Sequence, residues 1–273
     1  MAEVLYIFIT SDRPDQYLTP ILHCLQNRNV NKIVFLQVEN RPESEDDPNI
    51  SAKSVRQNVE TLLSFLADRC KYKYLTGKDK DKEVDLRTVY PPDQAASIKQ
   101  LYYMLKTRKF SFTEDDVDYF KLREKLIKIR KEEPESIFDV SAVRKSYLSD
   151  ILAMAVVEKI DNVYTIDLNR GPNFDEPWKS LFHELEFKKR GSNGYKYIQL
   201  TTTPIFNDCM KSILILQPSF ILSLLAAAAL IVALIITSLI FGSSNWLALI
   251  LGSLATIASI FSLVYTLPKF ITR

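Results

Sequence analysis

Two short polar segments of the chain carry side chains suited to holding an anion. One of them, Ser141–Ser146 (the second loop), supplies the hydroxyls of Ser141 and Ser146 and two adjacent cations, Arg144 and Lys145. A helical pattern follows, so free amides and the positive end of a helix dipole would lie beside the cations. That combination favours a phosphate. The alternative interpretation is that Ser141 caps the helix and both cations are solvated.

The other segment, Thr10–Gln16 (the first loop), offers related groups near the N-terminus. Thr10, Ser11 and Arg13 could contact a phosphate, and Tyr17 behind them could provide a ring for stacking. An apolar run precedes each loop. Because ligands of doubly wound sheets bind beyond the carboxyl ends of the strands, we expect both loops to line one cleft. Here too the alternative is that Ser11 only caps a helix.

No enzyme signature accompanies these loops. The glycines form neither GxGxxG nor GxxxxGK[ST], and GxSxG, HExxH and CxxC are absent from the sequence. His23 and His183 lie in amphipathic patterns and are interpreted as structural. The cysteines, Cys24, Cys70 and Cys209, are irregularly spaced, which predicts neither disulfides nor a zinc site. We therefore expect no catalytic residue, metal or cofactor.

The elements that must position the loops alternate between strand and helix. Continuous β-branched and aromatic runs are typical of strands buried on both faces. The strands are predicted at Val4–Ile9, Ile33–Val38, Ile137–Val140 and Val163–Leu168, with helices at Tyr17–Gln26 and Tyr147–Lys159. Two strand–helix–strand units predict an α/β fold, Rossmann-like, with a mainly parallel sheet flanked by helices.

The region between these units predicts further elements. Amphipathic spacing indicates helices, and Thr113 followed by acidic residues resembles a helix N-cap. The expected helices are Ser51–Asp68, one around Ile98–Leu105, and Thr113–Glu133; the expected strands are Tyr72–Leu75, Val84–Val89 and a last one at Tyr195–Thr202.

Charge is distributed unevenly along the chain. The residues up to Lys211 carry 33 basic and 33 acidic side chains, a formal net charge of zero. Binding of duplex nucleic acid through a strongly basic surface is thereby excluded. Positions 212–268 form a run of 57 residues without charge, which ends at Lys269. A water-exposed surface is not built from such a run.

This run predicts two transmembrane helices, Ser219–Phe241 and Trp246–Leu267. At 1.5 Å per residue, each is long enough to cross a hydrocarbon core of roughly 30 Å. The short turn between them makes an antiparallel hairpin over 219–267. The basic residues lie outside both ends of the hairpin and none lies in its turn, which predicts a cytoplasmic N-terminal domain and C-terminus.

The expected organisation is a cytoplasmic domain over 1–203, a linker over 204–218, the hairpin, and a cytoplasmic tail over 268–273. Small and hydroxylated residues along both membrane helices allow packing within one hairpin or assembly of several chains. No ionisable residue lies within the hairpin. A proton relay, a voltage sensor and an ion-coupled transporter are therefore excluded.

The residues Val4–Tyr17 and Phe138–Asp167 (FDVSAVRKSYLSDILAMAVVEKIDNVYTID) resemble the CARF and SAVED sensors, in which a Rossmann-fold domain precedes an effector. Those proteins usually carry a Gly pair in the second turn, where this chain has Ser-Ala-Val-Arg-Lys. The resemblance implies a homodimer or higher homo-oligomer that binds a cyclic (oligo)nucleotide second messenger. With a membrane hairpin, it also implies a bacterial antiviral effector that permeabilises or depolarises the inner membrane.

Two other classes of function remain open. A membrane-anchored, ring-nuclease-like enzyme would use Thr10, Ser11 and Lys145 to position a phosphate without a metal, and would turn nucleotides over. A membrane-tethered scaffold would bind a protein partner and have no affinity for any nucleotide.

Overall fold

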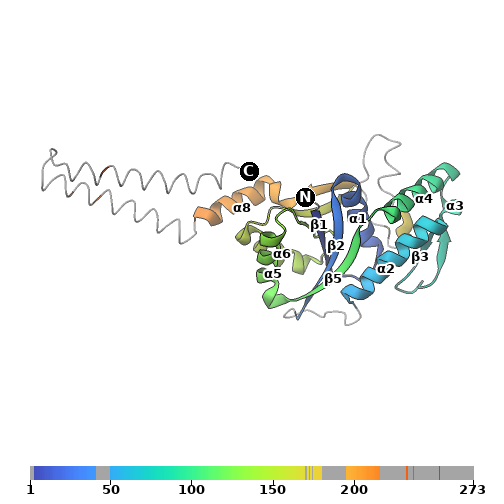
Figure 1. Cartoon of the computed structure of the whole chain (residues 1–273), viewed down its shortest axis with the longest axis horizontal. Helices are drawn as coiled ribbons and strands as arrows, with labels where there is room; N and C mark the ends of the chain where they lie inside the picture. The colour runs from blue at the N-terminus through green and yellow to red at the C-terminus, as the bar shows by residue number, and fades with distance from the viewer. Residues whose placement is uncertain are drawn as a thin grey trace. The chain divides into compact units, whose positions relative to one another are not determined.

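The computed structural model describes residues 3–40, 50–169, 171, 173, 175–179, 195–215, 232, 236 and 252. The chain divides into two compact units, Met1–Asn207 (the head) and Asp208–Arg273. Within the described part of the head, a central sheet is flanked by helices (Figure 1).

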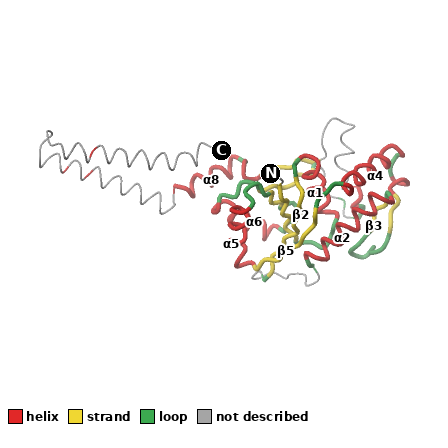
Figure 2. Tube along the Cα trace, in the orientation of Figure 1, coloured by secondary structure: helices red, strands yellow, loops and turns green. Residues whose placement is uncertain are grey.

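Six strands form the central sheet in the order β5-β2-β1-β6-β7-β8 (Figure 2). Five of them pair in parallel, and only β8 pairs antiparallel, with β7. The strands are β1 (Glu3–Ile9), β2 (Val30–Glu39), β5 (Ser111–Asp118), β6 (Ile137–Asp139), β7 (Val163–Leu168) and β8 (Tyr195–Gln199). The predicted α/β class with a mainly parallel sheet is confirmed.

Helices cover both faces of this sheet. Figure 1 places α1 and α2 on one side and α5 and α6 on the other. Central strands covered in this way must be apolar on both faces, and the adjacent residues Ile7 and Phe8 on β1 and Phe35 and Leu36 on β2, which point to opposite faces, are all buried. The helices described within the head are α1 (Asp15–Asn27), α2 (Ala52–Ser64), α3 (Leu86–Val89), α4 (Pro92–Thr107), α5 (Leu122–Glu132) and α6 (Lys145–Glu158), while α8 (Pro204–Ile215) spans the boundary between the two units.

A small antiparallel hairpin lies between β2 and β5 in the chain. Its strands are β3 (Lys71–Lys73) and β4 (Glu83–Asp85). It follows α2, which starts at a capping box on Ser51 and continues into a π-helical turn. The expected strand Val84–Val89 stops at Asp85, because the Asp85 carboxylate accepts the Arg87 amide and starts α3.

The predicted helix Thr113–Glu133 is wrong. Ser111–Asp118 is β5, an edge strand paired with β2 over eight residues, and the helix α5 starts only at Leu122. Pairing along the whole of β2 outweighs the local helix signals of Thr113 and the acids behind it. An edge strand also tolerates acidic side chains, and Arg56 and Lys125 offset two of them by ion pairs to Glu114 (2.7 Å) and Asp115 (2.5 Å).

The C-terminal predictions are only partly covered. The segment expected to be a linker, 204–218, contains α8 over Pro204–Ile215. The predicted hairpin, 219–267, lies outside the described residues except for positions 232, 236 and 252. Within the part of the chain that the structure describes, no helix has the length and apolar character needed to cross a membrane.

Candidate functional site

The sheet order changes direction between β1 and β6. From β1 the chain moves to β2 on one side, and it later returns to place β6 on the other. Both strands are parallel, so the loops that follow them emerge at the same edge of the sheet. Such a switch point is where open α/β sheets bind ligands.

The first and second loops meet at this edge through Thr10. Its hydroxyl donates to the carbonyl oxygen of Ala142 (2.7 Å) and accepts from the amide of Arg144 (3.1 Å). The structure therefore brings together two segments that lie about 130 residues apart. The Thr10 hydroxyl is occupied in joining them, so its role is to shape the loops.

The Ser141 hydroxyl likewise forms hydrogen bonds to two different strands, β6 and β7. Its Oγ donates to Oδ2 of Asp139 (2.9 Å) and accepts from the Ile166 amide on β7 (2.8 Å). Its own amide donates to Oδ1 of Asp139 (3.1 Å). Burial raises the pKa of the Asp139 carboxyl to about 6, although the hydrogen bonds from Ser141 partly oppose that rise.

The first-loop side chains also hold one another. The Tyr17 hydroxyl donates to the Ser11 carbonyl (2.7 Å) and accepts from the Ser11 amide (3.1 Å). The Tyr17 ring is fully buried and lies edge-on to Phe35, so the predicted role as a stacking surface is wrong. The Ser11 Oγ accepts from the Arg13 amide (3.2 Å), so this serine orders the loop as an ST-turn does.

Arg144 and Lys145 are the exposed cations of the site. Arg144 is the N-cap of α6 and Lys145 its first residue, and no side chain caps this helix. Within the described residues, neither side chain forms an ion pair or a side-chain hydrogen bond. Ser146 follows in the first turn of α6. Two unpaired cations at an uncapped helix start make an electropositive position suited to an anion.

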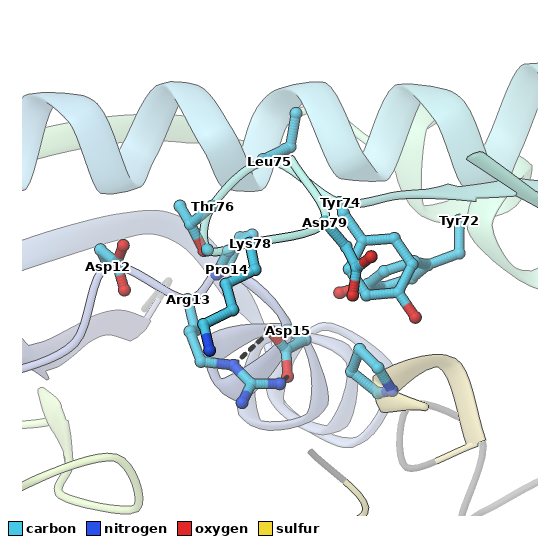
Figure 3. Close-up of a pocket in the computed structure, with 12 residues that line it drawn as sticks. Asp12, Arg13, Pro14, Asp15, Tyr72, Tyr74, Leu75, Thr76, Lys78 and Asp79 are labelled. Atoms are coloured by element: carbon cyan, nitrogen blue, oxygen red, sulfur yellow. Dashed lines mark hydrogen bonds and ion pairs between the residues drawn. The ribbon is translucent and has the colours of Figure 1, made fainter. Parts of the chain in front are cut away.

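A pocket lies beside the first loop. It has a volume of about 210 Å³ and is bounded by Asp12–Asp15, by Tyr72 on β3 together with Tyr74–Asp79 of the hairpin turn, and by Pro177. Figure 3 shows the Arg13–Asp15 pair facing Tyr72, Tyr74 and Lys78 from the hairpin. The guanidinium contacts the Asp15 carboxylate at 3.1 Å.

The polar groups of the pocket are of mixed charge. Burial raises the pKa of Asp15, while the neighbouring Arg13 guanidinium lowers it. Tyr72 is only 3% exposed and lines the pocket, and no hydrogen bond to its hydroxyl is found among the described residues. Three carboxylates line the pocket against two cations. This balance disfavours a phosphate and suits a neutral polar group that can both donate and accept hydrogen bonds.

Sequence reasoning missed two features of the site. Tyr72 was assigned only to a short strand, because nothing local places the hairpin beside the first loop. Asp139 was passed over, although an acidic residue at the end of a buried apolar strand is itself an unusual signal. Among the described residues, no group of three or more His, Cys, Asp or Glu side chains is arranged to hold a metal ion.

No protein-family model matches the sequence, and no curated protein matches it. Among solved structures, the chain is similar to Enterococcus italicus Csm6 bound to cyclic hexa-2'-fluoro-hexa-dAMP, with a TM-score of 0.38 and 12% identity. The match covers 98% of this chain and 58% of the Csm6 chain. A likeness of this extent carries no inference about the ligand of this chain.

Proposed function

We propose that the head binds a cyclic oligonucleotide at the edge of the sheet where the two loops meet. The observation that carries the proposal is the pair of exposed cations, Arg144 and Lys145, at the start of α6, where the described residues supply neither an ion pair nor a side-chain cap. Phosphates of the ligand would accept charge-assisted hydrogen bonds from these side chains. Thr10 and Ser141 would act indirectly, by holding the loops that present the cations.

The pocket beside the first loop favours a nucleotide, rather than a simple anion, as the ligand of the head. A nucleobase is a planar, neutral group with donors and acceptors along its edge, and proteins recognise it by stacking and by hydrogen bonds to that edge. The pocket is lined by the partly exposed ring of Tyr74 and by Tyr72, for whose hydroxyl no hydrogen bond is found in the described part of the chain. Its volume of about 210 Å³ admits a single base.

The proposed outcome of binding is a rearrangement of membrane hairpins in an antiviral effector. The uncharged run over 212–268 would form the hairpins in a bacterial inner membrane, with the head and the C-terminus in the cytoplasm. A homodimer or larger homo-oligomer would change its hairpin packing and so permeabilise or depolarise the membrane. A decisive shift needs about 5.5 kcal/mol of differential affinity, which several contacts of roughly 1.5–3 kcal/mol each would supply.

The enzyme alternative has no particular support in this geometry. The hydroxyls of Thr10 and Ser11 already hydrogen-bond to the loop backbone. The Thr10 hydroxyl, which both donates and accepts within the loops, is therefore engaged in shaping them rather than in positioning a phosphate.

The test uses the full chain reconstituted in dye-loaded liposomes. Cyclic tri-, tetra- and hexaadenylate and the cyclic dinucleotides are added one at a time, with linear oligoadenylates of equal length as controls. We expect one cyclic ligand to raise the melting temperature of the head and to release dye. Binding without dye release would reject the membrane step alone, and no thermal shift with any ligand would reject the nucleotide site. Conversion of the ligand, followed by chromatography, would favour the enzyme instead.

A further inference from the structure

The helix α4 has an outward face that carries almost no charge. Its opposite face is buried through residues such as Ile98, Leu101 and Leu105, and α4 packs beside α2 and the π-helical turn that follows α2 (Figure 1). At about 100° per residue, the residues directly opposite the buried face fall within an arc of about 120°. We call them the outer strip, and all are exposed: Asp93, Ala96, Ser97, Gln100, Tyr103, Met104 and Thr107.

The composition of the outer strip is unusual for a surface helix, which normally carries its charges on the side away from the core. The single charge of the strip is Asp93, at its N-terminal end, and the cations Lys99 and Lys106 lie to one side of it. Tyr103 is 55% exposed and Met104 is 53% exposed. Aromatic residues and methionine are enriched in protein interfaces, whereas lysine is depleted. The outer strip therefore has the composition of an interface.

The two hydroxyls of the outer strip are bonded to the backbone of α4 itself. Ser97 Oγ donates to the carbonyl oxygen of Asp93 (2.7 Å), and Thr107 Oγ1 donates to that of Met104 (3.0 Å). Each hydroxyl thus uses its one donor hydrogen within the helix. Burying the strip would therefore leave neither donor unpaired, which removes a main cost of covering polar side chains.

We propose that the outer strip is the surface through which two copies of this chain pair, with their α4 helices antiparallel about a two-fold axis at Gln100. The proposal deepens the assembly step of the proposed function, and it rests on that function only for its use in signalling. In such a symmetric interface, each residue faces the one that lies equally far from the axis on the other side.

The antiparallel arrangement sets large side chains of one copy against small ones of the other. Tyr103 lies three residues after Gln100 and faces Ser97, three residues before it; Met104 faces Ala96 in the same way. Alternation of large and small residues across facing positions is what close packing requires. A parallel arrangement would instead place Tyr103 against Tyr103.

Charge also favours the antiparallel pair. Asp93, at the start of α4, faces the end of the other helix, where the exposed Arg108 follows Thr107. The symmetry forms this contact between opposite charges twice. In a parallel pair, Asp93 would face a second Asp93, and like charges in apposition oppose association. Gln100, on the axis, can donate to and accept from its own copy.

The first test is oxidative cross-linking of the full chain in detergent, without ligand. A Cys209→Ser background removes the exposed native thiol, while Cys24 and Cys70 are buried. We expect Gln100→Cys to form a disulfide-linked dimer at least about 10-fold faster than Lys99→Cys, because Lys99 is an exposed neighbour that points about 100° away from the axis. Equal rates for the two variants, or no dimer from either, would overturn the proposal.

The second test reverses charges in the Gln100→Cys protein. Asp93→Arg should slow cross-linking about 5-fold, because the new cation would face Arg108 of the other copy. Adding Arg108→Asp in the same chain should restore the rate, which a general loss of folding would not allow. Failure of this rescue would refute the antiparallel arrangement. A chain that cross-links in the expected pattern yet binds no ligand of the panel would support the interface and reject the proposed function.

Discussion

The buried carboxylate of Asp139 makes the head less stable as pH rises, and Asp139→Asn should remove that dependence. The folded-state pKa is raised to about 6, above the ordinary value near 3.8. When the pKa of a group is higher in the folded state than in the unfolded state, its full contribution to the free energy of unfolding is present below the unfolded-state pKa. That contribution is lost as the pH rises through the folded-state pKa. The window for Asp139 therefore runs from about pH 4 to pH 7.

The magnitude follows from the pKa difference. At roughly 1.4 kcal/mol per pKa unit, the whole effect is about 3 kcal/mol, of which about 1.3 kcal/mol falls between pH 5 and pH 7. The Asn side chain does not titrate. The free energy of unfolding of Asp139→Asn, relative to the wild type, should therefore rise by about 1.3 kcal/mol from pH 5 to pH 7.

The assay is urea unfolding of the full chain in detergent at a series of pH values. Trp178 is buried in the head, and a Trp246→Phe background leaves it as the only tryptophan that reports unfolding. Burial lowers the pKa of His23, but His23 is present in both proteins and its contribution cancels. Parallel stability curves for the wild type and Asp139→Asn would refute the reasoning, since Asp139 would then be ionised as easily as an exposed aspartate.

Three further predictions concern the site and the topology. The double variant Arg144→Ala, Lys145→Ala should bind the active cyclic ligand about 100-fold more weakly by calorimetry, and its free energy of unfolding should change by less than about 0.5 kcal/mol. The control variant Lys128→Ala on α5 should bind the ligand as the wild type does. Equal affinities of the double variant and the wild type would show that the phosphates bind at another position. Tyr72→Phe should lower the affinity for the same ligand about 5-fold, because the base loses a buried hydrogen bond. An unaltered dissociation constant would show that the base does not bind in the pocket. A cysteine placed at Ser244 should react with an impermeant maleimide added outside intact cells, while the exposed native Cys209 should not. The opposite labelling pattern would contradict the predicted orientation of the hairpin in the membrane.

The parallel core of the head was predictable because its strands are continuous apolar runs. Val4–Ile9 and Ile33–Val38 are buried on both faces, so their composition alone distinguishes them from half-exposed strands. Once the two strand–helix–strand units were recognised, the meeting of the first and second loops followed from the rules of parallel sheets. That is why Thr10 and Arg144, far apart in the sequence, were assigned to one site.

What the sequence could not predict depends on contacts without a local signature. β5 carries Glu114, Asp115 and Asp116, and only its pairing with β2 makes it a strand. Tyr72 reaches the pocket because the hairpin folds beside the first loop. Tyr197 stacks on Tyr164 from an antiparallel edge strand whose partner no periodicity indicates. Tyr17 was misassigned because an aromatic residue after a polar loop can equally well enter the core.

The central claim is that the second loop of the head binds a cyclic oligonucleotide through Arg144 and Lys145. The most direct measurement is calorimetric titration of the full chain in lipid nanodiscs with cyclic hexaadenylate and the other members of the panel, for the wild type and for the Arg144→Ala, Lys145→Ala double variant. We expect saturable binding of one cyclic ligand to the wild type, about 100-fold weaker binding to the double variant, and no binding of the matched linear oligonucleotide. Absence of heat with every cyclic ligand, or equal affinity of the two proteins, would contradict it.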